Sequence, residues 1–227
     1  MKNVRILNAW HIKLFMAALM VLDHLRYIQN LVPPDTTCVF SIISRCVAPM
    51  FCYLAVEGIR HTRNLKMYCF RLIVLAGIMF AGNAVVNWAF HSSIDNNVIF
   101  TLAMGALVIA LIKWGKEKEN TFLYILAGVC FIAGSLWGEW GTVLLPFMTV
   151  TYLFREKRVF LYIGYALIVV IAFLIPWGEP WWFIVFPFIL LYNGERGLNT
   201  RFTKYFFYVF YPLHLWIIAI INYAMAR

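Results

Sequence analysis

The sequence predicts an all-α fold, a polytopic bundle of about nine transmembrane helices with a range of roughly eight to ten. Of the 227 residues, 63% are hydrophobic and 13% are charged, whereas the apolar share of a water-soluble domain is about half. The apolar residues are grouped into runs near the ~20 residues that cross a bilayer. No loop is long enough to form a soluble domain, so residues 1–227 are interpreted as a single integral-membrane domain.

The predicted helices are the apolar runs in chain order. They lie at residues 12–31, 38–59, 70–90, 97–113, 121–137, 140–154, 159–176, 180–193 and 205–225. Most of these runs reach the roughly 17–25 residues of a membrane span. The runs at 140–154 and 180–193 are shorter, which favours less tilted helices, half-helices or a merger with a neighbouring run.

Ionisable side chains interrupt the first, second and last runs. They are Asp23, His24 and Arg26 in the first run, Arg45 and Glu57 in the second, and His214 in the last. A charge at membrane depth is costly, so these residues are functional-site candidates by default. With a rise of about 1.5 Å per residue, His24 and His214 fall at similar depths near the middle of the bilayer. We therefore expect His24, Arg45 and His214 to meet in a cavity between these three helices.

His24 is the candidate general base, because histidine exchanges a proton near neutral pH. Asp23 precedes it in sequence, but adjacent residues of a helix do not face each other. Asp23 is therefore expected to pair with Arg26, at i+3, or with another helix, and the partner of His24 stays open. The alternative is a buried histidine that bonds to a neighbouring helix and takes no part in chemistry.

Two prolines lie beside these ionisable residues. Pro49 and Pro212 lack an amide hydrogen and leave the carbonyls of Arg45 and Tyr208 without their helical partners. Freed carbonyls at membrane depth fit a wet internal cavity. Ordinary helix kinks explain the prolines equally well.

The third and fourth runs carry lines of uncharged polar residues. Asn83 and Asn87 are four residues apart, and Asn97, Thr101 and Gly105 form a second line with the same spacing. Polar and small side chains of this kind most often join neighbouring membrane helices. Helix contacts are therefore favoured over contacts with a substrate.

The orientation follows from the basic residues, which accumulate in cytoplasmic loops. Apart from Arg26, Arg45 and Arg227, all of the 19 basic residues lie in the N-terminal segment and alternate loops. This pattern predicts a cytoplasmic N-terminus and an external C-terminus. The net charge of +9 is thus a topology signal and does not indicate nucleic-acid binding. No cleavable signal peptide is expected, and the five cysteines lack metal-site spacing, so no metal site is predicted.

Several motifs together resemble the TraX family of conjugal pilin N-acetylases. They are Asp23-His24, Arg45-x-x-x-Pro49-x-Phe51, Val56-Glu57-Gly58-x-x-His61-Thr62-Arg63-Asn64-x-x-x-Tyr68-x-x-Arg71, Phe100-Thr101-Leu102, Tyr192-Asn193-Gly194-Glu195-Arg196-Gly197 and Lys204-Tyr205-x-Phe207-Tyr208-x-x-Tyr211-Pro212-x-His214. The last motif also looks like the final helix of the wider superfamily of integral-membrane acyltransferases. The resemblance spans nearly the whole chain, with little beyond Trp137-Gly138-Glu139 between residues 115 and 180.

The resemblance implies a membrane acyltransferase that takes an acetyl group from cytoplasmic acetyl-CoA and transfers it to an amine or hydroxyl. The acceptor stays open between pilin or another surface peptide, a cell-surface glycan and a lipid. The implied location is the cytoplasmic (inner) membrane of a bacterium, where the chain passes several times through the lipid. Acyl transfer requires a positioned base and a donor to the developing oxyanion.

These requirements give two sets of candidate residues. The catalytic candidates are His24, Asp23, Arg45, Glu57 and His214. His24 is expected to act as the base or to carry the acetyl group, and Arg45 to polarise the thioester carbonyl or hold a carboxylate. The candidates for binding acetyl-CoA, whose phosphates need cationic donors, are Arg60, His61, Arg63, Asn64, Lys66, Arg71, Tyr192, Asn193 and Lys204.

Two other function classes compete with an acyltransferase. A proton-coupled small-molecule transporter could use the same buried Asp23, His24, Arg45 and Glu57 as a relay. Transporters often show paired halves with matching broken helices, and this sequence has no such pairing. A structural subunit of a secretion or pilus system would need no buried ionisable centre.

Overall fold

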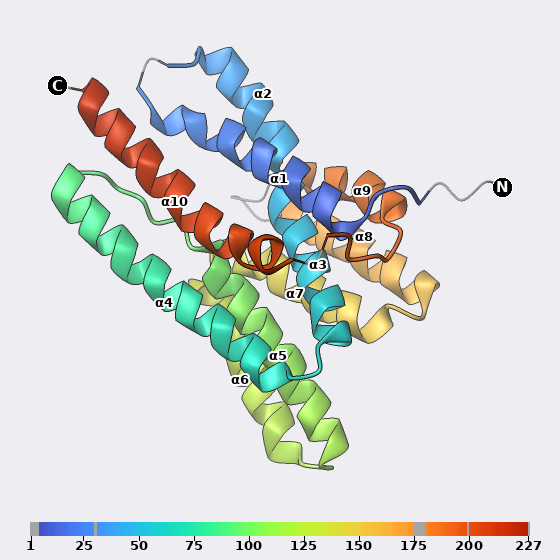
Figure 1. The fold of residues 1–227 in the computed structure, drawn as a ribbon. Coiled ribbons are helices and arrows are strands. Elements are labelled where there is room, and N and C mark those ends of the chain that lie inside the picture. Colours follow the sequence, from blue (N-terminus) through green and yellow to red (C-terminus); the bar gives the residue numbers. More distant parts are fainter. Residues whose placement is uncertain (1–4, 30, 175–179, 199, 227) are drawn as a thin grey trace. The chain divides into compact units, whose positions relative to one another are not determined.

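The computed structural model describes residues 5–29, 31–174, 180–198 and 200–226, with Pro180, Arg201 and Lys204 placed through their backbone alone (Figure 1). The helices are α1 (Ala9–His24), α2 (Pro34–Ser44), α3 (Val47–His61), α4 (Leu65–Phe90), α5 (Val98–Glu117), α6 (Thr121–Trp137), α7 (Gly141–Phe154), α8 (Arg158–Leu174), α9 (Val185–Leu191) and α10 (Arg201–Met225), with 3₁₀ turns at Leu25–Tyr27 and Pro180–Ile184. The predicted all-helical fold is confirmed. Extended pairing in the described residues is limited to one isolated bridge between Leu7 and Tyr192.

The helix boundaries agree with the sequence prediction in the middle of the chain and depart from it near the ends. The predicted run at 121–137 coincides with α6, and the run at 140–154 differs from α7 by one residue. The run at 159–176 begins one residue after the start of α8, and its last two positions lie outside the described residues. The predicted helix 12–31 is wrong in its second half, because α1 ends at His24 and the chain is extended at Ile28. The predicted helix 180–193 is a 3₁₀ turn followed by the short α9.

The predicted helix 38–59 is two helices. α2 ends at Ser44 and α3 begins at Val47, so Pro49 occupies the third position of α3. Amides of the first helical turn have no intrahelical acceptor, and a proline there costs no hydrogen bond. The expected kink is an interruption of the helix at residues 45–46, and Arg45 is the C-cap of α2.

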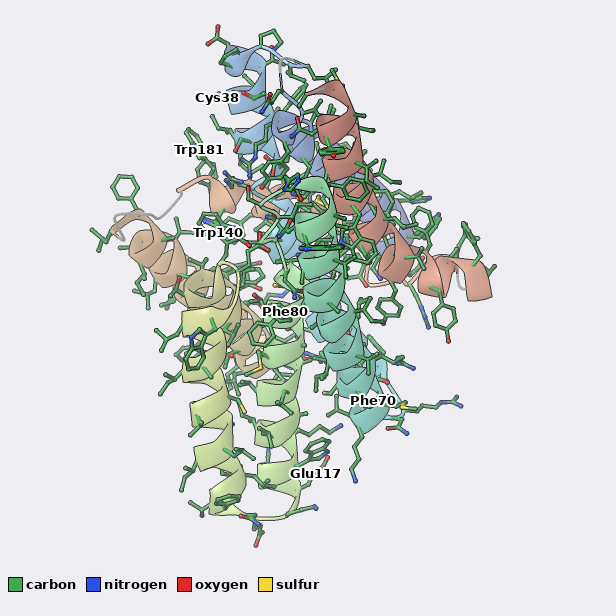
Figure 2. All side chains as sticks on the ribbon, turned by 90° about the vertical axis from the view of Figure 1, so that its left-hand side faces the viewer. Cys38, Phe70, Phe80, Glu117, Trp140 and Trp181 are labelled. Carbon is green, nitrogen blue, oxygen red and sulfur yellow. The ribbon has the colours of Figure 1, made fainter. Side chains whose placement is uncertain are left out.

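Within the part of the chain that the structure describes, four stretches are long and apolar enough to cross a membrane: Pro34–His61, which includes the α2–α3 interruption, Leu65–Phe90, Val98–Glu117 and Tyr205–Met225. Apolar side chains line the outer surfaces of the helices (Figure 2). On α4, for example, Phe70 and Phe80 are 58% and 55% exposed. Exposed apolar surface on this scale is unusual in a soluble protein, and the chain is a membrane protein.

The described residues form two compact units. The first unit comprises those within Met1–Met50, Met79–Asp95 and Trp181–Arg227, and the second those within Phe51–Ile78 and Asn96–Pro180. The boundary passes through α3 and α4, which are continuous helices. Each unit is described by itself below.

The second unit is built around α5, α6 and α7, with α5 and α6 running side by side in opposite directions (Figure 1). Thr101 on α5 donates a hydrogen bond of 2.8 Å to the backbone carbonyl of Glu139. The Glu139 carboxylate accepts bonds from the Asn96 side chain and the Asn97 amide, at 2.9 and 2.6 Å. The Asn97 side chain also bonds to the Ala76 carbonyl on α4. The expectation that Asn97 and Thr101 join helices is thus confirmed.

In the first unit, α4 approaches α10 at Gly82. The indole nitrogen of Trp216 on α10 donates a hydrogen bond of 3.0 Å to the Asn83 side chain, which confirms the helix-joining role of Asn83. A Cβ atom added to Gly82 would lie 2.0 Å from the Trp216 ring. The close approach of these helices therefore requires glycine at position 82.

The Gly82→Ala substitution is expected to destabilise the protein by about 1–3 kcal/mol, because the added methyl group overpacks the helix contact and displaces Trp216. The matched control is Gly77→Ala on the same helix, where an added Cβ meets no described heavy atom within 4 Å. That substitution should be neutral or slightly stabilising, since alanine has the higher helix propensity. Thermal unfolding in detergent measures both variants, and equal stability of the two would contradict the assignment.

Candidate active site

The two membrane histidines are in contact although they lie 190 positions apart in the sequence. His24 is the last residue of α1, and its Nδ1 is 2.8 Å from Nε2 of His214 on α10. The rings are stacked with centroids 5.0 Å apart, and both residues are only 7% exposed. The expected meeting of the two histidines is confirmed as a contact. Their catalytic role stays a prediction.

The hydrogen bonds of the pair define which ring nitrogens carry protons. Nδ1 of His214 lies 3.0 Å from the Phe210 carbonyl oxygen, and a carbonyl oxygen can only accept. Nδ1 is therefore the donor, and Nε2 of a neutral His214 is an acceptor. His24 must donate to it from its own Nδ1, so Nε2 of a neutral His24 keeps a lone pair. Two hydrogen bonds thus hold His24 in the tautomer that a general base needs.

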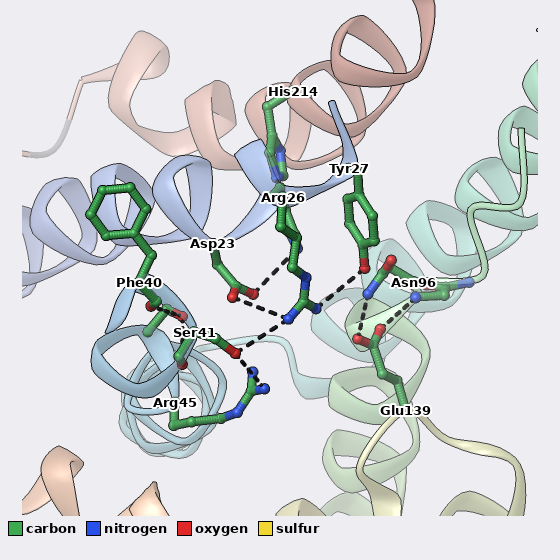
Figure 3. Close-up of polar contacts among 12 residues, drawn as sticks. Asp23, Arg26, Tyr27, Phe40, Ser41, Arg45, Asn96, Glu139 and His214 are labelled. Atoms are coloured by element: carbon green, nitrogen blue, oxygen red, sulfur yellow. Dashed lines mark hydrogen bonds and ion pairs between the residues drawn. The ribbon is translucent and has the colours of Figure 1, made fainter. Parts of the chain in front are cut away.

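Asp23 connects this pair to a polar network between α1 and α2 (Figure 3). Its Oδ2 atom lies 4.0 Å from Nε2 of His24, and its Oδ1 atom lies 3.5 Å from Nη1 of Arg26. The expected pairing of Asp23 with Arg26 is confirmed. Arg26 in turn donates a 3.3 Å hydrogen bond to the Ser41 hydroxyl, which also accepts a 2.8 Å bond from Nη2 of Arg45.

The network places Arg45 and the histidines in the same unit, joined through the Ser41 hydroxyl. Ser41 has no motif of its own, although its position four residues before Arg45 puts the two on one face of α2. The network joins the guanidinium groups of Arg26 and Arg45 to the Asp23 carboxylate and the Ser41 hydroxyl. Guanidinium groups beside a neutral histidine pair are donors of the kind that a developing oxyanion requires.

Glu57 belongs to the second unit and has a different partner. Its buried carboxylate accepts a 2.7 Å hydrogen bond from Nε of Arg155, which follows the end of α7. The Arg155 guanidinium also lies over the Tyr53 ring, 5.3 Å from its centroid. Arg155 could not be singled out from sequence, because basic residues in alternate loops are explained by membrane topology.

The α3–α4 turn carries most of the residues predicted to bind acetyl-CoA. His61, Arg63 and Lys66 are exposed, and Arg71 is half-buried on α4. The Asn64 side chain caps α4 by accepting a 3.0 Å bond from the Met67 amide. Cationic side chains are thus exposed on this turn, and their role in binding acetyl-CoA stays a prediction.

Arg60 connects this turn to the α7–α8 turn. It forms a hydrogen-bonded ion pair with Glu156, and this bond holds the pKa of the Glu156 carboxyl below its ordinary value. The two turns join different pairs of helices and are far apart in the sequence, but they belong to the same unit and are in contact. The sequence predicted Arg60 as a phosphate-binding residue, but it did not indicate the ion pair with Glu156.

Tyr192 and Asn193, two further predicted binding residues, hold the segment before α1. The Leu7 amide donates to the Leu191 carbonyl at 3.0 Å, and the Asn193 amide donates to the Leu7 carbonyl at 2.9 Å. Tyr192 is buried beside this bridge. The structure therefore gives both residues a role in positioning the start of α1. The side chain of Lys204 lies outside the described residues.

No group of three or more His, Cys, Asp or Glu side chains within the described ranges is arranged to hold a metal ion. The histidine pair offers a base and lies beside a network that contains two guanidinium groups.

Comparisons with known proteins identify the family of this chain. Residues 10–222 match the family described as TraX protein. The chain is also similar to the probable fimbrial assembly protein FimC, serogroup H1, of Dichelobacter nodosus, with 26% identity over 201 residues. The alignment covers 76% of this chain and 78% of that relative. No solved structure matches it. Since the family match covers almost the entire chain, the protein belongs to the TraX family.

Proposed function

We propose that the protein is a membrane-embedded acyltransferase that moves an acetyl group from acetyl-CoA to an amine or hydroxyl of an acceptor. The observation that carries the proposal is the buried His24–His214 hydrogen bond, which leaves Nε2 of His24 free to take a proton. The name of the fimbrial relative favours a fimbrial or pilin subunit as acceptor, ahead of a surface glycan or lipid. The proposed setting is the cytoplasmic membrane of a bacterium, with the N-terminus inside.

The proposed reaction uses His24 first as a base and then as an acid. Nε2 of His24 removes a proton from the acceptor amine or hydroxyl, whose nitrogen or oxygen attacks the thioester carbonyl. Arg45 donates to the resulting oxyanion. The carbon–sulfur bond then breaks, and the thiolate leaves and takes the proton from His24. Transfer through an acetylated His24 is the alternative route to the same product.

His214 and Asp23 support His24 in this scheme. The bond from His24 Nδ1 to His214 fixes the orientation of the base, and the charge that His24 acquires can be delocalised along the pair. The Asp23 carboxylate lies 4.0 Å from Nε2, the ring nitrogen that takes the proton in this scheme. Arg26 holds the Asp23 carboxylate in place.

The donor is proposed to bind through its phosphates at the α3–α4 turn. Arg63 and Lys66 are exposed there, and neither has a carboxylate partner among the described residues. Free guanidinium and ammonium groups form strong charge-assisted hydrogen bonds with phosphate oxygens. The chemistry of the turn therefore fits a nucleotide-type thioester.

We expect purified protein in detergent to bind acetyl-CoA saturably, as measured by equilibrium dialysis with labelled acetyl-CoA. A proton-coupled transporter or a structural assembly subunit has no need of this ligand. Binding should be competed by unlabelled coenzyme A. Absence of binding, together with proton-driven uptake of a small molecule into proteoliposomes, would favour the transporter.

A further inference from the structure

The contact between Glu57 and Arg155 leaves part of the arginine available for a ligand. Glu57 is engaged through Nε of Arg155, at 2.7 Å, and no other hydrogen bond of this guanidinium is found among the described residues. The Arg155 side chain is 29% exposed, whereas that of Glu57 is 9% exposed. The two terminal nitrogens of Arg155 therefore carry N–H donors without an acceptor among the described residues.

Two contacts fix the direction of this guanidinium group. The Glu57 carboxylate, held on α3, accepts from the Nε side, and the Tyr53 ring lies beneath the guanidinium carbon at 5.3 Å. The Nε–H and one terminal N–H lie on the guanidinium edge that faces the carboxylate, whereas the end of the group, formed by the other N–H bonds of the two terminal nitrogens, points away from it. A planar fork held in this way is suited to bidentate recognition of a phosphate.

The neighbourhood of Arg155 is basic and belongs to the second unit. The ion pair between Arg60 and Glu156 holds the α7–α8 turn against the end of α3. Lys157 and Arg158 follow Arg155 in that turn, and both are exposed. Glu156, already engaged by Arg60, is the exposed carboxylate of the turn. Arg60, at the end of α3, thus lies beside the cations of the α7–α8 turn.

We propose that Arg155 binds a phosphate of the acyl donor and that Glu57 is a positioning residue that orients Arg155. This inference rests on the proposed function and extends the donor site from the α3–α4 turn to the α7–α8 turn. It assigns Glu57 a role through Arg155 in place of the direct catalytic role expected from sequence. The ligand class is a phosphate-bearing thioester such as acetyl-CoA.

The test compares coenzyme A with two of its parts, one that carries phosphate without the pantetheine arm and one that is the pantetheine arm without phosphate. Dissociation constants of coenzyme A, adenosine 3′,5′-diphosphate and pantetheine are measured for the wild type and for Arg155→Gln, Arg155→Lys and Glu57→Gln. Arg155→Gln should weaken both phosphate-bearing ligands by about 10- to 100-fold, since it removes hydrogen bonds to a charged group. Pantetheine binding should not change. Lys118→Gln, in the α5–α6 turn, is the control for loss of one positive charge.

Further variants separate a positioning role from a structural one. Glu57→Gln should weaken coenzyme A less than Arg155→Gln does, and the double variant should bind as Arg155→Gln binds, because Glu57 acts through Arg155. Arg155→Lys keeps the charge without the fork and should recover only part of the affinity. In Glu57→Gln the charge of Arg155 loses its partner, which can prevent folding. The double variant Glu57→Gln/Arg155→Gln removes this charge as well and takes the place of Glu57→Gln if that single variant does not fold.

The outcomes that overturn the inference are distinct from failure of the proposed function. If the wild type binds coenzyme A and Arg155→Gln binds it with the same affinity, the inference is overturned and the proposed function is not. The same holds if Arg155→Gln loses as much affinity for pantetheine as for coenzyme A. Absence of coenzyme A binding by the wild type overturns both. The same phosphate chemistry occurs in anionic lipid headgroups, so binding is repeated with phosphatidylglycerol in the detergent. If Arg155→Gln changes the response to this lipid but leaves coenzyme A affinity intact, Arg155 is a lipid contact.

Discussion

Replacement of His24 by alanine is expected to lower acetyl transfer by roughly 10²- to 10⁴-fold, the usual contribution of a positioned general base. The physical reason is the free lone pair on Nε2, which the His24–His214–Phe210 hydrogen bonds maintain. Acetyl-CoA affinity should be retained, because the basic turns that are proposed to bind the phosphates are unchanged. The measurement is kcat with acetyl-CoA at saturation, beside the dissociation constant of acetyl-CoA.

The matched control is His11→Ala, which removes an exposed histidine from the first turn of the same helix. This variant should keep wild-type kcat. His214→Ala should fall between the two, since it removes the group that orients His24 but leaves the base itself. Wild-type activity in the His24 variant would restrict that residue to a structural role.

Replacement of Arg45 by glutamine is expected to lower kcat by about 10²- to 10³-fold, the range found when one donor to an oxyanion is removed. Arg45 is held by the Ser41 hydroxyl at 2.8 Å and shares that hydroxyl with Arg26, so its guanidinium is oriented before substrate binds. A contact made in the transition state lowers kcat and kcat/KM together when it is lost.

Two companion variants sharpen the test at Arg45. Arg45→Lys keeps the charge and should recover part of the rate. Ser41→Ala keeps the guanidinium but removes the hydroxyl that orients it, so we expect a smaller loss than for Arg45→Gln. A rise in KM with unchanged kcat in Arg45→Gln would instead identify Arg45 as a binding residue.

The contact between His24 and His214 was predictable because both side chains are ionisable and occur inside apolar runs. That pattern restricts where such residues can face. Their hydrogen bond depends on how α1 ends, and the sequence suggested a helix continuing to residue 31. In the structure α1 ends at His24, and a 3₁₀ turn follows at Leu25–Tyr27.

The pairing of Glu57 with Arg155 could not be predicted, for two reasons. The residues are separated by 98 positions, and their contact depends on tertiary packing of α3 against the end of α7. Arg155 also lies among basic residues that membrane topology alone explains. The close approach of Gly82 to the Trp216 ring could not be predicted either, since it depends on the position of Trp216 on another helix.

The helix break between α2 and α3 was partly predictable. Pro49 indicated a disturbance near Arg45, because a proline in a helix interior removes a hydrogen bond. Whether the proline kinks one helix or lies at the start of a new one depends on its position relative to the first turn of the helix that contains it. In the structure Pro49 lies within the first turn of α3, where its missing amide is tolerated.

The most direct test of the proposed acetyl transfer is the movement of label from acetyl-CoA to an acceptor in membranes. Membranes containing the wild-type protein are incubated with acetyl-labelled acetyl-CoA, and labelled peptides, glycans and lipids are identified by mass spectrometry. We expect label in an amide or ester of one acceptor class, dependent on His24 and lost when acetyl-CoA is omitted. Equal labelling in membranes that lack the protein, or in those containing the His24→Ala variant, would contradict acetyl transfer at the histidine pair.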